Sequence, residues 1–119
     1  MARALRVRLI AVKKEINHEK LRVEDELAAM KEDYPDPFDK AIPQTMCGLE
    51  VKNLRLKAQL NRAHLYGRLF SGDVIYRCIP CFILHDVRLN MTRTKSTVAG
   101  VKRYKCPRCG DELNSDDQP

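Results

Sequence analysis

The sequence predicts a mainly α (α+β) fold, in which a long antiparallel α-helical hairpin (coiled coil) precedes a small C-terminal zinc-ribbon-like module with short β-strands. Three observations support this prediction: two segments repeat apolar residues at helical spacing, a proline-rich turn separates them, and two Cys-x-x-Cys pairs follow. The hairpin is expected to span residues 1–73, with its tip at residues 34–42. The cysteine module is expected to span residues 74–113, and a flexible tail residues 114–119.

The first predicted helix, residues 2–33, carries a heptad-like apolar seam. Its apolar residues recur at steps of three and four, and charged residues of both signs occupy the other positions. No Gly or Pro interrupts the segment, so it is expected to be one continuous helix. The seam consists of Leu5, Leu9, Val12, Ile16, Val23, Leu27 and Met30.

The second predicted helix, residues 44–71, repeats this pattern. Asn53 and Gly67 fall on its stripe: Asn53 would either fix the register or be a tolerated polar residue at a loose point, and Gly67 weakens the helix. Each stripe needs apolar cover, so the two helices are expected to fold back on each other. Pairing between two chains is the alternative, and the prolines of the turn disfavour it. The apolar stripe consists of Leu49, Leu56, Leu60, Ala63 and Phe70.

The connection between the helices reads YPDPFDKA over residues 34–41. Its two prolines disfavour continued helix and push the residues before them toward an extended conformation. Asp39 is expected to cap the second helix through its carboxylate. Pro43 suits a first helical turn, so the second helix is expected to begin between Lys40 and Gln44.

Charge and composition narrow the classes of partner. The chain has 119 residues, a formal charge of +6 and a pI of about 9.2. Such a balance favours nucleic acid, an anionic membrane face or an acidic protein surface. No apolar run approaches the roughly 20 residues of a membrane span, and the arginine-dotted N-terminus lacks the apolar stretch of a signal peptide. We therefore expect a cytoplasmic protein that does not enter a membrane.

Four cysteines form two Cys-x-x-Cys pairs, Cys78 with Cys81 and Cys106 with Cys109. Two thiolates from each pair can complete a tetrahedral site for one Zn²⁺ ion, and a four-thiolate site has no open position, so its expected role is structural. Two disulfides or a redox pair are the alternatives, which a reducing compartment and the lack of a βαβ pattern disfavour. Cys47 is expected to be a small residue near a helix start, with a reactive thiol as the alternative.

The module is expected to contain short strands and a basic face. Strands are predicted at Phe82–Leu89, which would carry His85 on its surface, and at Thr97–Tyr104, and the tail after Leu113 is expected to fray. Between the cysteine pairs, basic residues greatly outnumber the single acid, so this face is a candidate for phosphate contact, with a solvated loop as the alternative. The candidate basic patch consists of Arg88, Arg93, Lys95, Lys102, Arg103 and Lys105.

No catalytic constellation is visible in the sequence. Asp36 and Asp39 are paired carboxylates, but no His, Ser or third acid accompanies them at a motif spacing. Such a pair could hold Mg²⁺ weakly, although turn and capping roles are commoner. We do not expect an enzyme.

The hairpin tip and its spacing resemble the DksA/TraR family, whose members regulate RNA polymerase in bacteria and phages. The octapeptide YPDPFDKA is similar to the family's [FY]-P-D-P-x-D-[RK]-A, and LEVKN, residues 49–53, is similar to its L-E-[LV]-[RK]-N. Cys78 follows Asp39 at close to the family's usual interval. The likeness covers about residues 20–81.

The resemblance implies a function and a set of site residues. The hairpin would enter the secondary channel of RNA polymerase, its tip would alter the stability of open promoter complexes, and the zinc module would stay outside. Asp36, Asp39 and Ala41 would be the polymerase-contacting residues of the tip. Lys52 and Asn53 would lie on a polymerase-facing part of the second helix. A monomer with one structural zinc ion and no substrate is expected.

Some positions depart from the family pattern. The two cysteine pairs stand further apart than usual, and an acidic tail follows Cys109 where many members carry a helix. In long members, a basic residue three positions beyond the Asn of L-E-x-x-N helps to bind guanosine tetraphosphate. That position is Leu56 here, so binding of this nucleotide is not expected.

Three hypotheses of function follow from these patterns. The first is a regulator that acts through the secondary channel of RNA polymerase. The alternative is a zinc-ribbon protein that binds nucleic acid and uses its hairpin for dimerisation or as a spacer. A scaffold or adaptor for another protein is the third.

Overall fold

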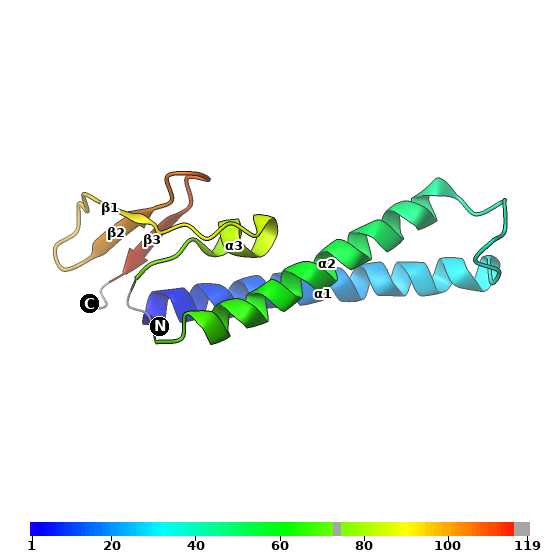
Figure 1. Cartoon of the computed structure of the whole chain (residues 1–119), viewed down its shortest axis with the longest axis horizontal. Coiled ribbons are helices and arrows are strands. Elements are labelled where there is room, and N and C mark those ends of the chain that lie inside the picture. The colour runs from blue at the N-terminus through cyan, green and yellow to red at the C-terminus, as the bar shows by residue number, and fades with distance from the viewer. Residues whose placement is uncertain (73–74, 116–119) are drawn as a thin grey trace.

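The computed structural model describes residues 1–72 and 75–115, which form a slender rod with a small module at one end (Figure 1). The molecule as a whole, with the module included, measures 61 × 23 × 21 Å. Helices α1 and α2 run antiparallel, and the module contains a short helix, α3, and a three-stranded sheet. The elements are α1 (Arg3–Asp33), α2 (Gln44–Leu69), α3 (Ile79–His85), β1 (Thr92–Thr94), β2 (Lys102–Lys105) and β3 (Glu112–Ser115).

The predicted helical hairpin is confirmed, within two residues at each helix end. The first seam lies against α2: five of its residues are buried, and Val12 and Met30 pack partly buried against the same core. Each fully buried Leu or Val contributes roughly 1.5–3 kcal/mol relative to an exposed one, so the seam is the main source of hairpin stability. Supercoiling of the pair stays a prediction. The buried residues of α1 are Leu5, Leu9, Ile16, Val23 and Leu27.

Two residues of the α2 stripe, Gly67 and Asn53, interrupt its apolar pattern. A Cβ added at Gly67 would stand 3.6 Å from Leu9 Cδ2, so the helices approach each other closely at this point. Asn53 is half-buried, and its Oδ1 is buried without a hydrogen-bond partner among the described residues. An unmade bond of this kind costs about 1–3 kcal/mol, so Asn53 weakens the seam where it sits.

The turn between the helices differs from the prediction in its capping. Helix α2 begins at Gln44, inside the expected range, and Pro43 occupies the position before it without a side-chain cap. Asp39 lies four residues upstream of Pro43, so the prediction that it caps α2 is wrong. Its Oδ1 accepts a hydrogen bond from the N–H of Ala41 instead, at 2.9 Å.

Residues 82–85, predicted as part of a strand, belong to helix α3. Pro80 lies in its first turn, where the missing N–H costs nothing. The helix is buried on several sides, because Phe82 meets the rings of Tyr66 and Phe70 edge-on at 5.6 Å while Cys81 faces the cysteine cluster. A short apolar segment that is buried on all sides shows neither the helical nor the strand period in its sequence, which explains why a strand was predicted here. His85 is therefore an exposed helix residue rather than a strand residue.

The three strands form an antiparallel sheet in the order β1-β2-β3. The strand predicted at Thr97–Tyr104 is found only from Lys102, because a turn with Gly100 at φ 79° occupies its first half. Strands β1 and β3 were not predicted. Strand β3 carries the module to Ser115, where the hydroxyl of Tyr76 bonds Ser115 Oγ at 2.6 Å, so these residues are not a frayed tail. Residues 116–119 lie outside the described part of the chain.

Side chains from the hairpin fix the module against it. Arg62 donates to the carbonyl oxygen of Ile83 at 2.6 Å, and the Tyr66 hydroxyl donates to the carbonyl of Arg77 at 2.8 Å. Arg8 spans to the sheet, bonding Asp111 Oδ1 at 3.2 Å and the carbonyl of Glu112 at 3.0 Å.

None of the described helices is both long enough and apolar enough to cross a membrane.

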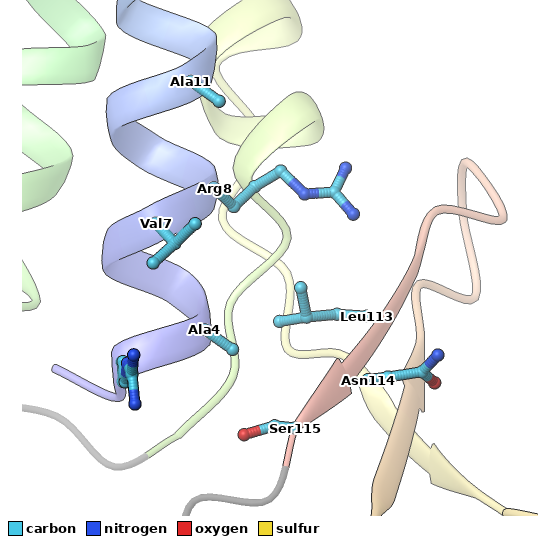
Figure 2. A pocket seen from close by; sticks show the side chains of 8 residues that line it. Ala4, Val7, Arg8, Ala11, Leu113, Asn114 and Ser115 are labelled. Atoms are coloured by element: carbon cyan, nitrogen blue, oxygen red, sulfur yellow. The ribbon is translucent and has the colours of Figure 1, made fainter.

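An open pocket of about 540 Å³ lies between the first turns of α1 and strand β3 (Figure 2). Leu113 and Ser115 point toward the helix and Asn114 points away, as the alternation of a strand requires. Arg8 crosses this gap with its bonds to Asp111 and Glu112, so the pocket forms part of the joint between hairpin and module.

Candidate metal centre and hairpin tip

The four predicted ligands meet at one point in the module. Their Sγ atoms all lie within 4.8 Å of one another, with Cys78 and Cys109 3.4 Å apart and Cys81 and Cys106 3.6 Å apart. Metal–sulfur bonds of about 2.3 Å in a tetrahedron place the sulfurs about 3.8 Å apart, so the cluster has the size of a tetrathiolate site. All four thiols are free rather than joined in disulfides. The arrangement fits one metal ion.

Backbone N–H groups support the second cysteine pair. The N–H of Arg108 points to Cys106 Sγ and that of Asp111 to Cys109 Sγ, each at 3.4 Å. Gly110 makes this turn possible, because its φ of 79° lies in the left-handed region that side chains disfavour. Such bonds favour thiolates, which are the form that binds a metal.

The cysteines differ in how readily they lose a proton. Burial is the main reason why the pKa of Cys78 lies far above its usual range. Burial also acts to raise the pKa of Cys106, but hydrogen bonds from the backbone of Cys109 and Arg108 and from neighbouring thiols bring it down to about 7. A cation at the centre would be needed to hold all four as thiolates, because four negative charges so close together repel one another.

The cluster has a closed set of donors. Among the described residues, no other His, Cys, Asp or Glu joins these four within ligand distance of one another. His85 is exposed at the end of α3, and Cys47 is exposed in the first turn of α2, as expected for a residue near a helix start. The guanidinium of Arg108 lies 3.6 Å from Cys81 Sγ and offers positive charge to the thiolates.

The hairpin tip is a pair of consecutive Asx turns. Asp36 Oδ1 accepts the N–H of Phe38 and Asp39 Oδ1 accepts the N–H of Ala41, both at 2.9 Å. The N–H of Asp39 also donates to the carbonyl of Asp36, at 3.2 Å. Each carboxylate thus uses one oxygen to hold the turn and presents the rest of its charge at an exposed surface. The structure brings the three predicted tip residues, Asp36, Asp39 and Ala41, together on one short loop.

Phe38 is a tip residue that the sequence reasoning missed. It stands between the two aspartates and is 88% exposed, the most exposed of the large apolar side chains in the described residues. A pocket of about 350 Å³, which Phe38 does not line, lies at the base of the loop and is lined by Tyr34, Pro35, Pro37 and Ile42 together with side chains from the two helix ends. The sequence could have indicated this exposure, because an aromatic residue within a short polar turn has few apolar neighbours that could bury it.

The second helix meets the first at the residues predicted to face a partner. Lys52 bonds Glu19 Oε1 of α1 at 2.5 Å, and the side-chain oxygen of Asn53 is buried. Leu56, three positions beyond Asn53, is only 7% exposed and belongs to the core. The Lys52 side chain is still 34% exposed, so the role of Lys52 and Asn53 in facing a partner stays a prediction.

The candidate basic patch is divided between two faces of the sheet. Residues directly opposite in the ladder share a face, so Arg93 lies with Tyr104, and Lys102, two positions along, lies on that side too. Arg103 and Lys105 lie on the other face, where Arg103 pairs with Glu112 at 2.5 Å. Arg88 stands apart after α3, 5.8 Å from the Phe82 ring.

Comparisons with protein families, curated proteins and solved structures found no match for this chain.

Proposed function

We propose that this protein regulates transcription in the cytoplasm of a bacterium, or of a phage-infected cell, by binding RNA polymerase. The hairpin tip enters the secondary channel and changes the stability of open promoter complexes, and no substrate is turned over. The observation that carries the proposal is the tip itself: two carboxylates held by Asx turns at the far end of a rod. The sequence of the tip also resembles the tip motif of the DksA/TraR family.

The dimensions of the rod suit entry into a narrow channel. The molecule is 61 Å long but only 23 and 21 Å across, and the module lies at the end opposite the tip (Figure 1). The exposed ring of Phe38 and the free carboxylate oxygens of Asp36 and Asp39 are then the first groups to meet a partner. A preformed turn gives up little conformational entropy on binding, which favours this contact.

The metal of the module is zinc in this proposal. Four thiolates at tetrahedral spacing are typical of structural Zn²⁺, and a closed set leaves no position for catalysis. Cys78, Cys81, Cys106 and Cys109 would hold the ion, which ties α3 to the turn after β2. Its role is to keep the module rigid at the base of the hairpin.

The charge of the tip can be tested apart from its shape. In Asp39→Asn the side-chain oxygen still accepts the N–H of Ala41, so the turn persists while the negative charge is lost. Asp39→Ala removes both the hydrogen bond to the N–H of Ala41 and the negative charge. We expect Asp39→Asn to bind core RNA polymerase like the wild type but to lose most of the effect on transcription from a ribosomal promoter in a purified assay. Asp25→Asn, an exposed residue of α1, is the control with equal charge.

Two results would contradict the proposal. One is full transcriptional activity of Asp39→Asn together with Asp36→Asn. The other is failure of the wild-type protein to bind core RNA polymerase in the absence of DNA. A hairpin in which residues 35–41 are replaced by a glycine-serine linker should bind polymerase without regulating it.

A further inference from the structure

We infer that the β1–β2 ribbon is a binding surface for the phosphate backbone of a nucleic acid. The surface, called the ribbon patch below, consists of Arg93, Lys95 and Lys102. It lies at the end of the molecule opposite the tip (Figure 1), so it is a second contact that the proposed channel insertion does not use. It does not depend on the proposed function.

The ladder register gathers these three cations on one side. Arg93 is opposite Tyr104 in the ladder, and Lys102 precedes Tyr104 by two positions, so both side chains stand on the same face. Lys95 follows Arg93 by two positions, just past the end of β1. Neighbours of this kind in a ribbon lie about 5–7 Å apart, close enough to engage adjoining phosphates.

A shallow pocket joins the three cations. It has a volume of about 400 Å³ and is lined by the ribbon patch with Thr94, Ser96, Val98 and Val101, without any acidic side chain. Within the described residues, none of the three cations forms an ion pair, unlike Arg103 on the other face. Positive charge that the described residues leave uncompensated attracts an external polyanion.

The loop that carries the patch is ordered by its own hydrogen bonds. Ser96 Oγ bonds both the carbonyl and the N–H of Val98, at 3.1 and 3.2 Å, and the N–H of Val101 returns to the Val98 carbonyl at 3.3 Å. Gly100 supplies the left-handed residue that the turn needs. The cations therefore project from a fixed ribbon, and less order has to be imposed when an anion binds.

The composition of the patch favours a nucleic acid over an acidic protein. Protein interfaces depend on buried aromatic or large aliphatic anchors, and the apolar side chains of this pocket are only Val98, which is 59% exposed, and the partly exposed Val101. Backbone contacts to a nucleic acid need cations and hydroxyl groups at regular intervals and no such anchor. Contacts to phosphates carry no sequence information, so binding through this patch is expected to be independent of sequence.

The salt dependence of binding measures the number of phosphates engaged. We would follow the fluorescence anisotropy of a labelled 20-base-pair DNA, and of single-stranded RNA of the same sequence, with the full-length metal-loaded protein. Three phosphate contacts predict a slope of log K against log salt of about −2.7 for the duplex and about −2.1 for the single strand. Duplex affinity should fall about 40-fold between 50 and 200 mM salt.

Matched variants separate the patch from the general charge of the protein. Arg93→Gln/Lys95→Gln/Lys102→Gln and Arg6→Gln/Lys13→Gln/Lys14→Gln both lower the formal charge from +6 by three. We expect the ribbon variant to lose salt-dependent binding and the α1 variant to keep most of it. Lys95 lies outside the strands, so Lys95→Gln should not disturb the sheet. It should make the slope of log K against log salt shallower by about one.

Three results would overturn the inference: equal loss of binding in both triple variants, a slope unchanged in Lys95→Gln, or competition by polyglutamate as strong as by unlabelled DNA. The last would assign the patch to an acidic protein. Asp39→Asn should bind nucleic acid normally, and the ribbon variant should still act on core polymerase. Failure of this inference and failure of the proposed function are thus distinguishable.

Discussion

At the scale of single residues, Glu19 links the two helices of the hairpin. Its carboxylate accepts hydrogen bonds from Arg22 on its own helix and from Lys52 on α2, each as close as 2.5 Å. These two contacts, with Arg22 the larger, lower the pKa of Glu19 to about 2. No spacing rule within either helix predicts the Lys52 contact, because the pair depends on the register between the helices.

The lowered pKa gives a pH dependence with a defined sign. A carboxyl whose pKa falls on folding adds stability that is present above its ordinary value, near 4.5, and is lost as the pH drops toward 2. We expect the melting temperature of Glu19→Gln to lie below that of the wild type at pH 6 and to approach it near pH 2. Thermal melts followed by circular dichroism check this, with Glu15→Gln, an exposed residue of α1, as control. A pH-independent difference would contradict the assignment.

At the scale of elements, the close approach of α1 and α2 is set by small residues. Ala63 is completely buried, and Gly67 lies opposite Leu9. Gly48, near the other end of α2, has no atom within 4 Å of an added Cβ. The two glycines therefore share a helix and a backbone conformation but differ in their surroundings.

Substitutions at these glycines should diverge with side-chain size. Alanine at either position is expected to stabilise the protein by about 0.5–1 kcal/mol, because glycine costs conformational entropy in a helix and the Cβ at position 67 would meet Leu9 at an ordinary contact distance. Leucine should remain harmless at Gly48 but destabilise by about 1–3 kcal/mol at Gly67, where it overfills the interface. Unfolding in urea measures the free energy of unfolding of the alanine and the leucine variants at each glycine. Equal effects of Gly48→Leu and Gly67→Leu would show that the interface is looser than described.

At the scale of the whole molecule, the hairpin and the module depend on the metal to different degrees. The hairpin has a seam of its own, whereas the module has a few short strands around the four cysteines. The stacked rings of Tyr76 and Tyr104, 3.9 Å apart, belong to the module. The core at the joint is shared, because Phe82 of α3 packs against Tyr66 and Phe70.

Removal of the metal should therefore unfold the module and weaken the hairpin. We expect one metal ion per chain, and chelation should abolish the near-ultraviolet dichroism of the tyrosines while most helical signal survives at low temperature. The melting temperature should fall, because the joint loses its packing. Cys81→Ser should mimic chelation and Cys47→Ser should not. A chelated protein with unchanged spectra and melting would refute a structural role for the metal.

The sequence by itself determined the two helices, the turn between them and the four cysteines that gather at one point. Each of these depends on local chemistry: apolar residues repeat with the helical period, prolines stop a helix, and paired thiols at short spacing converge on one centre. The exposed carboxylates of Asp36 and Asp39 could be placed on the tip for the same reason. Their bonding within the turn could not, and Asp39 proved to hold the loop instead of capping α2.

Only the tertiary structure decided the fold of the module and the division of its charges. Residues 82–85 of α3 were predicted as part of a strand, because a short helix that is buried on several sides shows no helical period in its sequence. Strands β1 and β3 are too short to show an alternation of apolar and polar residues. The sequence indicated that the six basic residues form one face of the module. Pairing in the ladder separates Arg93, Lys95 and Lys102 from Arg103 and Lys105, because a strand sends successive side chains to opposite sides and only the register says which strands share a side.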